Sequence, residues 1–268
     1  MLDFLVMLKI QTIASGSKGN CTFIASENTR ILVDIGLSLR ELTARLRASN
    51  IDPSSINAVL VTHEHSDHIY GITNFLKNFN CKIFLHEDSI DVVKRFVNFK
   101  EELLEVFNSK FQIGDVKVNF FPVPHDSEFC FGYSFKKDEC KICLATDLGT
   151  VSPALLAHMN DSQIVMLECN HDLMKLQNNI RYPAVLKRRI AGSNGHLSNT
   201  AASLAIYELA KLGVQQIILA HLSEQNNTPT LAYNFVRDFL SQKGLVEGKD
   251  ISVDVAEQHK PSRLYQID

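Results

Sequence analysis

The feature that most constrains this chain is the stretch 62–68, THEHSDH, which follows an apolar run expected to form a buried strand. In extended backbone, residues two apart point the same way, so we expect His63, His65 and Asp67 to converge on one point. His68, the next residue along, would point elsewhere and serve a neighbouring ion. Imidazole and carboxylate donors suit Zn, Mn or Fe. Solvated histidines in a polar loop are the alternative, which the position directly after a buried strand disfavours. The stretch therefore predicts a site for two metals.

Length and composition indicate an ordinary globular chain. It has 268 residues, of which 45% are hydrophobic and 21% are charged, enough for one large domain with a substantial core. Because we find no linker or repeat, we expect a single domain over residues 1–268. Residues 1–6 are interpreted as an extension or alternative start ahead of Met7. The fold class expected from the pattern of strands and helices is mixed α/β (α+β).

Charge and cysteine usage restrict where the protein acts. The net charge of −3 argues against coating nucleic acid by charge alone, although it leaves room for a local basic groove. No apolar run approaches the ~18–20 residues needed to cross a bilayer, so no membrane association is expected. The six cysteines show no paired framework, and Cys140 and Cys143 should lie on opposite faces of a strand. We therefore expect reduced cysteines and a cytoplasmic location.

Local patterns predict the order of the elements. We expect short antiparallel strands at 9–13, 21–25 and 31–36, followed by a helix with Ser38 at its cap. Further strands are expected at 82–85, 116–123, 132–135, 141–146, 163–167, 215–220 and 251–255. Helices are expected at 70–79, 88–106, 198–212 and 229–240, together with a long basic helical stretch that ends at residue 190.

Polar residues recur where apolar strands end. His63, His125, Asp147, Glu168 and His221 each stand at such an end. A lone histidine after a strand is more often structural. Five such ends beside the 62–68 stretch reverse that expectation, because strand ends on one edge of a sheet lie close together.

Residues 63–68, HEHSDH, resemble the signature of the metallo-β-lactamase superfamily. The resemblance implies a four-layer αββα sandwich with metals at the sheet edge. It implies seven ligands that share two ions: His63, His65 and His125 for the first, Asp67, His68 and His221 for the second, and Asp147 as the bridge. Histidine at position 65 argues against the di-iron redox branch, where a carboxylate stands. Thioesterases, lactonases and nucleases remain as candidate classes.

The segment 168–196 favours the nucleases among these classes. Residues 167–171, LECNH, and 193–197, SNGHL, are similar to motifs in which an acid orients a histidine beside the scissile phosphate. Glu168 and His196 would take these roles, and Asp67 would also orient the attacking water. The alternative is that His196 only marks a turn before a helix.

A basic segment precedes His196. We interpret Lys187, Arg188 and Arg189, together with His171, as candidate phosphate contacts. The alternative for the basic run is a solvated helix face.

Motifs from 14–21 to 220–226 resemble, in order, those of the YycJ/WalJ group within the superfamily. This resemblance implies an exonuclease that acts 5′ to 3′ on double-stranded DNA, with DNA as its partner. Two divalent ions, Mn or Zn, would share a hydroxide that serves as the nucleophile. The alternative is a small-molecule hydrolase, a glyoxalase-II-like thioesterase or a lactonase, on the same metals. A regulatory scaffold is a third reading, against which the complete ligand set argues. The sequence predicts no oligomeric state.

Overall fold

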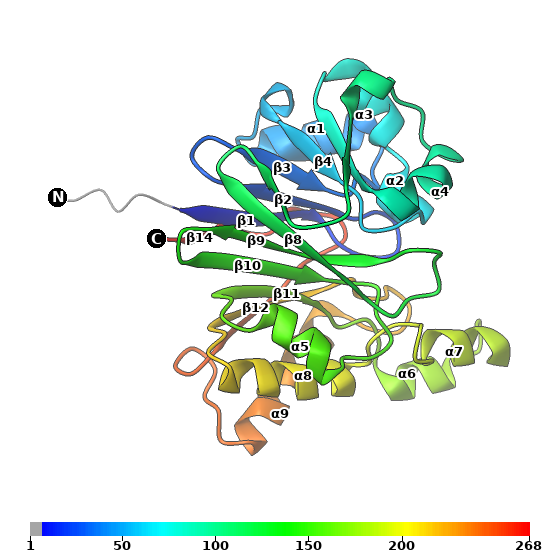
Figure 1. Ribbon diagram of the computed structural model, residues 1–268. Helices are drawn as coiled ribbons and strands as arrows, with labels where there is room; N and C mark the ends of the chain where they lie inside the picture. The colour runs from blue at the N-terminus through cyan, green and yellow to red at the C-terminus, as the bar shows by residue number, and fades with distance from the viewer. Residues whose placement is uncertain (1–6) are drawn as a thin grey trace.

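The computed structural model describes residues 7–268, and the expected extension at residues 1–6 lies outside the described residues. Within 7–268 the strands form two seven-stranded sheets that face each other, with helices on the outer face of each (Figure 1). This is the four-layer αββα sandwich expected from the sequence, and the fold class is confirmed.

The first sheet has the order β14-β1-β2-β3-β4-β5-β6. Its strands are β1 (Leu8–Ala14), β2 (Cys21–Ala25), β3 (Arg30–Val33), β4 (Ala58–Leu60), β5 (Lys82–His86), β6 (Leu104–Phe107) and β14 (Tyr265–Ile267). Strands β1, β2 and β3 pair antiparallel, as expected, and β3 to β6 pair parallel. The last strand of the chain, β14, completes the sheet beside β1.

The second sheet repeats this plan in the order β13-β12-β11-β10-β9-β8-β7. Its strands are β7 (Phe111–Ile113), β8 (Val116–Pro122), β9 (Phe131–Lys137), β10 (Cys140–Ala145), β11 (Ile164–Glu168), β12 (Gln216–Ala220) and β13 (Ser252–Val255). Strands β7 to β10 pair antiparallel and β10 to β13 pair parallel. The carboxyl ends of β10, β11 and β12 therefore meet at one edge of the sheet.

The helices divide between the two outer faces. The first half of the chain contributes α1 (Leu39–Ala48), α2 (Ser66–Ile69), α3 (Ile72–Asn78) and α4 (Ile90–Lys94), and the second half contributes α5 (Pro153–Met159), α6 (Leu173–Asn178), α7 (Ala184–Ile190), α8 (Asn199–Lys211) and α9 (Pro229–Gln242). Ser38 caps α1 as expected, since its side chain accepts from the backbone N–H of Glu41. None of the helices in residues 7–268 is both long and apolar enough to span a bilayer.

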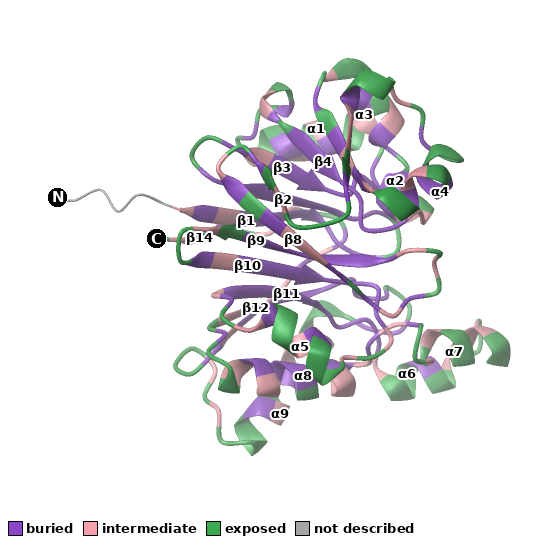
Figure 2. Ribbon diagram, in the orientation of Figure 1, coloured by how far each residue is buried: buried purple, intermediate pink, exposed green. Residues whose placement is uncertain are grey.

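Strand residues alternate between two apolar layers. On β11, Ile164 and Met166 join the core between the sheets, whereas Val165 and Leu167 join the core beneath α5, α8 and α9. Both faces of these strands are covered, so they read as continuous apolar runs. Figure 2 shows the result: buried strands in the middle and exposed outer surfaces on the helices.

The cysteines follow the same alternation. Cys140 lies in the core between the sheets and Cys143 in the outer core, on opposite faces as expected. All six cysteines are buried and free.

Two helix predictions were wrong. The expected helix 88–106 ends at Lys94, and its last residues form β6. Its continuation, 96–99, contains aromatic, β-branched and Asn residues of low helix propensity, and 104–107 gains backbone partners on β5. The long basic helix is instead two short ones, α6 and α7, because Pro183 removes a backbone donor and disfavours helix at the residue before it.

Three elements were not expected, and one helix begins earlier than expected. Helix α5 and strands β7 and β14 had no recognised pattern, and both strands are only three residues long. The helical residues after the histidine stretch begin at Ser66 rather than at residue 70.

Tyr133 ties the second sheet to the loop that carries the histidines. It is fully buried on β9, and its hydroxyl donates to the carbonyl of Val61 over 2.6 Å. We expect Tyr133→Phe to lower the free energy of unfolding by about 1–3 kcal/mol, because it leaves a buried acceptor unpaired. Urea unfolding of chelated protein measures this. Tyr70→Phe, which removes an exposed hydroxyl, is the control, and equal effects of the two changes would contradict the assignment.

Candidate metal centre

Strand ends from both sheets meet at one edge of the sandwich. The first sheet delivers His63, just beyond β4. The second delivers His125, Asp147 and His221, which follow β8, β10 and β12. The imidazoles of His63 and His125, from different sheets, have ring centroids 5.0 Å apart. The centre therefore depends on the packing of both sheets.

The first cluster consists of imidazoles only. His63, His65 and His125 offer ligand atoms that lie within 4.8 Å of one another. His125 Nε2 and His65 Nδ1 are 3.3 Å apart. These are the three residues that the family resemblance assigned to the first ion.

The second cluster mixes imidazole and carboxylate. Asp67, His68 and His221 also offer ligand atoms within 4.8 Å of one another. Asp147 stands between the clusters: its carboxylate lies 3.3 Å from His68 Nε2, 3.3 Å from His221 Nδ1 and 3.9 Å from His125 Nε2. This position is compatible with a carboxylate shared by two ions.

The geometric argument for residues 63–67 was wrong for Asp67. The chain is extended only as far as His65, and Ser66 begins the helical turn α2. In a helical turn, adjacent side chains diverge by only about 100°. Asp67 therefore joins His68 in the second cluster instead of converging with His63 and His65.

Asp34 supports the second cluster and was missed by the sequence analysis. It is buried at the end of β3, and its carboxylate accepts from His68 Nδ1 over 2.7 Å. The same carboxylate accepts from the backbone N–H and the hydroxyl of Thr62, over 2.8 and 2.7 Å. A polar residue after an apolar strand is the pattern found at the other strand ends, so the signal was present.

Glu168 holds two histidines, not one. It is fully buried, and Oε1 accepts from both His196 Nδ1 and His221 Nδ1 over 2.8 Å. Oε2 accepts from the backbone N–H groups of Leu148 and Leu197. The pair Glu168–His196 was expected from the sequence, whereas the bond to His221 was not.

The backbone turns sharply at three of these residues. Asp34, Asp147 and His221 have φ values of 62°, 58° and 54°, in the left-handed region that L-residues seldom adopt. Such conformations persist only where surrounding contacts determine them. Gly36 adds a close approach, because a Cβ atom there would lie 1.7 Å from the carbonyl oxygen of Asp67.

The side chains fit divalent metal ions. His63 Nε2, Asp147 Oδ2 and His221 Nε2 are buried and have no hydrogen-bond partner among residues 7–268. In three histidines the protein itself binds Nδ1. His68 Nδ1 is bound to Asp34, His125 Nδ1 to the carbonyl of Gly195, and His221 Nδ1 to Glu168. Metal-binding histidines are oriented in this way, with one nitrogen on a carboxylate or carbonyl and the other on the ion. Three buried polar atoms without partners thus point to bound cations.

The two clusters differ in electrostatics. Burial, reinforced by neighbouring imidazoles, lowers the pKa of His63, and burial also lowers the pKa of His125. In the second cluster burial is outweighed by carboxylates. Asp147, Asp34 and Asp67 raise the pKa of His68, and Asp147, Asp67 and Glu168 raise the pKa of His221 to about 10. Without metal, His63 and His125 are therefore neutral at pH 7, whereas His68 and His221 hold protons.

The expected phosphate contacts lie in two different environments. Helix α7 has no buried residue, and its Arg189 pairs with Asp126, next to His125. Lys187 Nζ donates to the carbonyl of Gln177. His171, by contrast, is only 1% exposed, and burial lowers its pKa to about 4. Its assignment as a phosphate contact needs correction, because a neutral side chain below the surface offers a phosphate neither charge nor an accessible donor.

Comparisons with known proteins agree with this architecture. Residues 29–222 match the family described as "Beta-lactamase superfamily domain". The chain is 30% identical to "Exodeoxyribonuclease YycJ" of Bacillus anthracis, over 97% of this chain and 99% of that protein. It is 31% identical to "Exodeoxyribonuclease WalJ" of Streptococcus pneumoniae D39, over 91% and 93% of the two chains. The crystal structure of YhfI from Bacillus subtilis, a metallo-β-lactamase fold protein, superposes with a TM-score of 0.73 at 14% identity, covering 97% and 99%.

The electrostatic difference predicts how metal binding depends on pH. Because a metal must displace protons from His68 and His221, whose pKa values are raised, affinity at the second cluster should rise with pH through the neutral range. Affinity at the first cluster should change less, because the pKa values of His63 and His125 are lowered. Calorimetric titration with Zn²⁺ at pH 7, in two buffers of different ionisation enthalpy, measures the protons released. His65→Ala should retain the proton-releasing step and His221→Ala should lose it, and equal proton release in both variants would contradict the assignment.

Proposed function

Because the chain belongs to the metallo-β-lactamase superfamily, in the group of YycJ and WalJ, and is a metal-dependent hydrolase, we propose that it degrades DNA as a two-metal phosphodiesterase. In its specific form the proposal is a 5′-to-3′ exonuclease on double-stranded DNA. The curated relatives are named exodeoxyribonucleases, which supports a nucleic-acid substrate.

The pair Glu168–His196 beside the clusters carries the proposal. His196 Nδ1 is bound to Glu168 and lies 3.8 Å from Asp147 Oδ1, and its side chain is 22% exposed. Burial lowers the pKa of His196, but the charge of Glu168 and the hydrogen bond to it outweigh burial and raise that pKa. The raised pKa favours the protonated ring, in which Nδ1 donates to Glu168. Nε2 is then left to donate to a phosphate oxygen or to the leaving group.

The proposed ligands are His63, His65 and His125 for one ion, Asp67, His68 and His221 for the other, and Asp147 between them. When bound, two divalent ions, Mn or Zn, would supply an activated water and offset the negative charge of the phosphate. Asp67, whose Oδ2 accepts from Asn20 over 3.2 Å, is fixed at the rim and would orient the attacking water.

Helix α7 supports a polyanionic substrate. It presents Lys187, Arg188 and Arg189 on an exposed helix, and the Arg189–Asp126 pair places the end of that helix at the rim of the centre. Cations in this position would meet phosphates of a strand that enters the site. A small-molecule thioesterase or lactonase would have no use for them.

The experiment that tests the function compares wild type with His196→Ala on end-labelled duplex DNA in Mn²⁺, beside a thioester and a lactone. We expect wild type to release nucleotides from the 5′ end. His196→Ala should keep both metals and lower turnover by about 10²–10³-fold, the range for one transition-state donor. Metal content and unfolding are measured on the same samples.

Glu168→Gln is the matched variant. Because Glu168 also holds His221, this change should lower both turnover and affinity at the second cluster, whereas His196→Ala should lower turnover alone. Loss of a metal in His196→Ala would make that residue a ligand. Hydrolysis of the thioester or lactone without DNA cleavage would contradict the nuclease function and support a small-molecule hydrolase.

The basic helix predicts a salt dependence. Replacing Lys187, Arg188 and Arg189 with Ala should weaken DNA binding and flatten its dependence on salt, by roughly 0.9 in the log–log slope per lost contact. Since Arg189 is already paired with Asp126, Arg189→Ala alone should change the slope less than Arg188→Ala. Fluorescence anisotropy over a salt series measures this, and an unchanged slope in the triple variant would return the helix to a solvated face.

A further inference from the structure

A groove of about 580 Å³ lies beside the first metal cluster and borders one of its residues. His65, a member of that cluster, lines it, together with Tyr70 beyond α2 and Phe96 beyond α4. Tyr70 also borders a second cavity, of about 340 Å³, that reaches Asp67 of the second cluster. The side chain of Tyr70 therefore borders both the groove that contains His65 and the cavity that contains Asp67.

The groove holds the two exposed phenylalanine and tyrosine side chains of residues 7–268. Among the phenylalanines and tyrosines in residues 7–268, only Tyr70 and Phe96 are exposed, at 67% and 63%. Every other phenylalanine and tyrosine in that range is buried or half-buried. Two aromatic rings left in water beside a reaction centre indicate a surface that covers a flat apolar group of a ligand.

The charges of the groove select against phosphate. Glu64 and Glu128 are its acids, and Arg95 is paired with Glu128 over 2.7 Å. Glu64 accepts from the backbone N–H of residue 128 and so fixes that part of the wall. A net negative wall repels a phosphate backbone but accepts hydrogen bonds from the exocyclic amino groups of bases.

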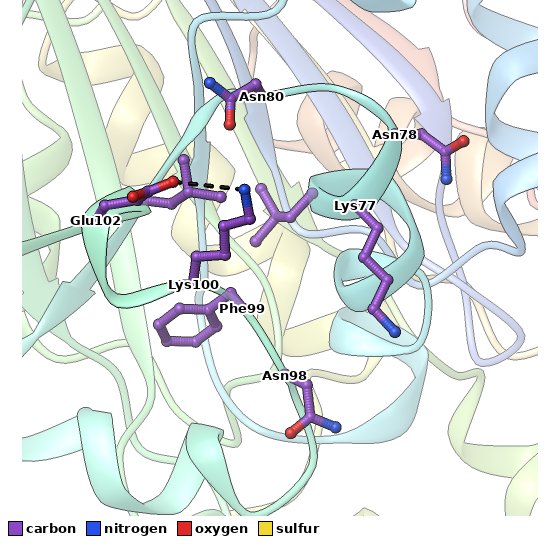
Figure 3. A pocket seen from close by; sticks show the side chains of 9 residues that line it. Lys77, Asn78, Asn80, Asn98, Phe99, Lys100 and Glu102 are labelled. Carbon is purple, nitrogen blue, oxygen red and sulfur yellow. Dashed lines mark hydrogen bonds and ion pairs between the residues drawn. The ribbon is translucent and has the colours of Figure 1, made fainter.

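Another cavity, away from the metal clusters, offers a contrast. It has a volume of about 620 Å³ and lies between α3 and the loop before β6 (Figure 3). Its lining is dominated by Lys77, Lys100 and three asparagines, with one half-buried ring, Phe99. It shares no residue with the metal clusters found in residues 7–268. We therefore choose the candidate substrate groove by its contact with His65 and not by its volume.

The two aromatic rings of the groove and the basic helix α7 come from different halves of the sandwich. Tyr70 and Phe96 follow α2 and α4 of the first half, and α7 extends from the second half (Figure 1). A strand that crosses the metal centre would meet cations on one side and aromatic rings on the other. This arrangement separates the contacts to its backbone from the contacts to its bases.

We propose that the groove of Tyr70 and Phe96 stacks the bases next to the scissile phosphate, so that the centre receives an unpaired strand end. The inference rests on the proposed nuclease function and adds the recognition of bases to it. Stacking on aromatic rings tolerates any base, because every base has a flat face. Tyr70 and Phe96 are positioning residues: they hold the nucleotide and leave the reacting atoms to the metal centre.

The test combines changes in the protein with changes in the substrate, in the manner of a double-mutant cycle. One oligonucleotide carries ordinary bases and a second carries abasic residues at the digested end, with all phosphates kept. Tyr70→Ala and Phe96→Ala should each lower kcat/KM on ordinary DNA by about 10-fold, mainly through KM. On the abasic DNA, wild type should be slow, and the variants should cause little further loss. Tyr70→Phe and Phe96→Tyr, which keep a ring, should restore most of the activity.

Three measurements keep the outcome decisive. Metal content shows that Tyr70→Ala leaves the ligands on α2 intact, and Leu204→Ala, a change of a 50% exposed residue on α8, is the control with unchanged rate. The salt slope of binding should stay as in wild type, unlike that of the α7 variants. Equal losses on ordinary and abasic DNA, or no loss on either, would overturn the stacking proposal alone. Failure of wild type to digest DNA would overturn the proposed function, and the stacking proposal with it.

Discussion

Two buried carboxylates, Asp34 and Glu168, hold the centre together, one from each sheet. An ionised carboxylate inside a protein costs several kcal/mol unless it is fully paired. Asp34 is paired with His68 and with two donors of Thr62, and Glu168 with His196, His221 and two backbone N–H groups. Each carboxylate therefore fixes histidine rings and loop backbone at once. The rings are oriented by the fold, so an ion meets ligands that need little rearrangement.

Most of the fold could be predicted from the sequence, because strands and helices leave simple patterns of apolar residues. The buried strands β11 and β12 are continuous apolar runs, and the helices α8 and α9 each begin directly after a capping residue. The failures occurred where tertiary contacts override a local pattern. Residues 104–107 have apolar positions at helical spacing but gain a row of backbone partners on β5. Strand β14 is recognisable only when β1 is already in place beside it.

The centre was predictable to the level of residue type, less so to the level of partners. The polar residues at strand ends identified which side chains meet, because the carboxyl ends of parallel strands lie at the same edge of the sheet. It could not show that the chain turns into a helix at Ser66, which moves Asp67 from one cluster to the other. It also passed over Asp34, whose partners Thr62 and His68 lie about thirty residues away in sequence. A hydrogen bond of that separation leaves no periodic trace.

Charge gives a physical reason for the proposed base contacts. The net charge is −3, so the chain as a whole supplies no long-range attraction for a polyanion, and any attraction must be local. Of the three successive cations on α7, Arg189 is already paired with Asp126. Each phosphate contact adds to the affinity by an amount that falls as the salt concentration rises. The two remaining cations, Lys187 and Arg188, therefore add only weakly to the affinity at physiological ionic strength. A DNA strand, the proposed substrate, would therefore gain from a second, salt-independent source of binding energy close to the metal clusters. Two aromatic rings beside His65, in a groove whose acids disfavour phosphate, can supply it.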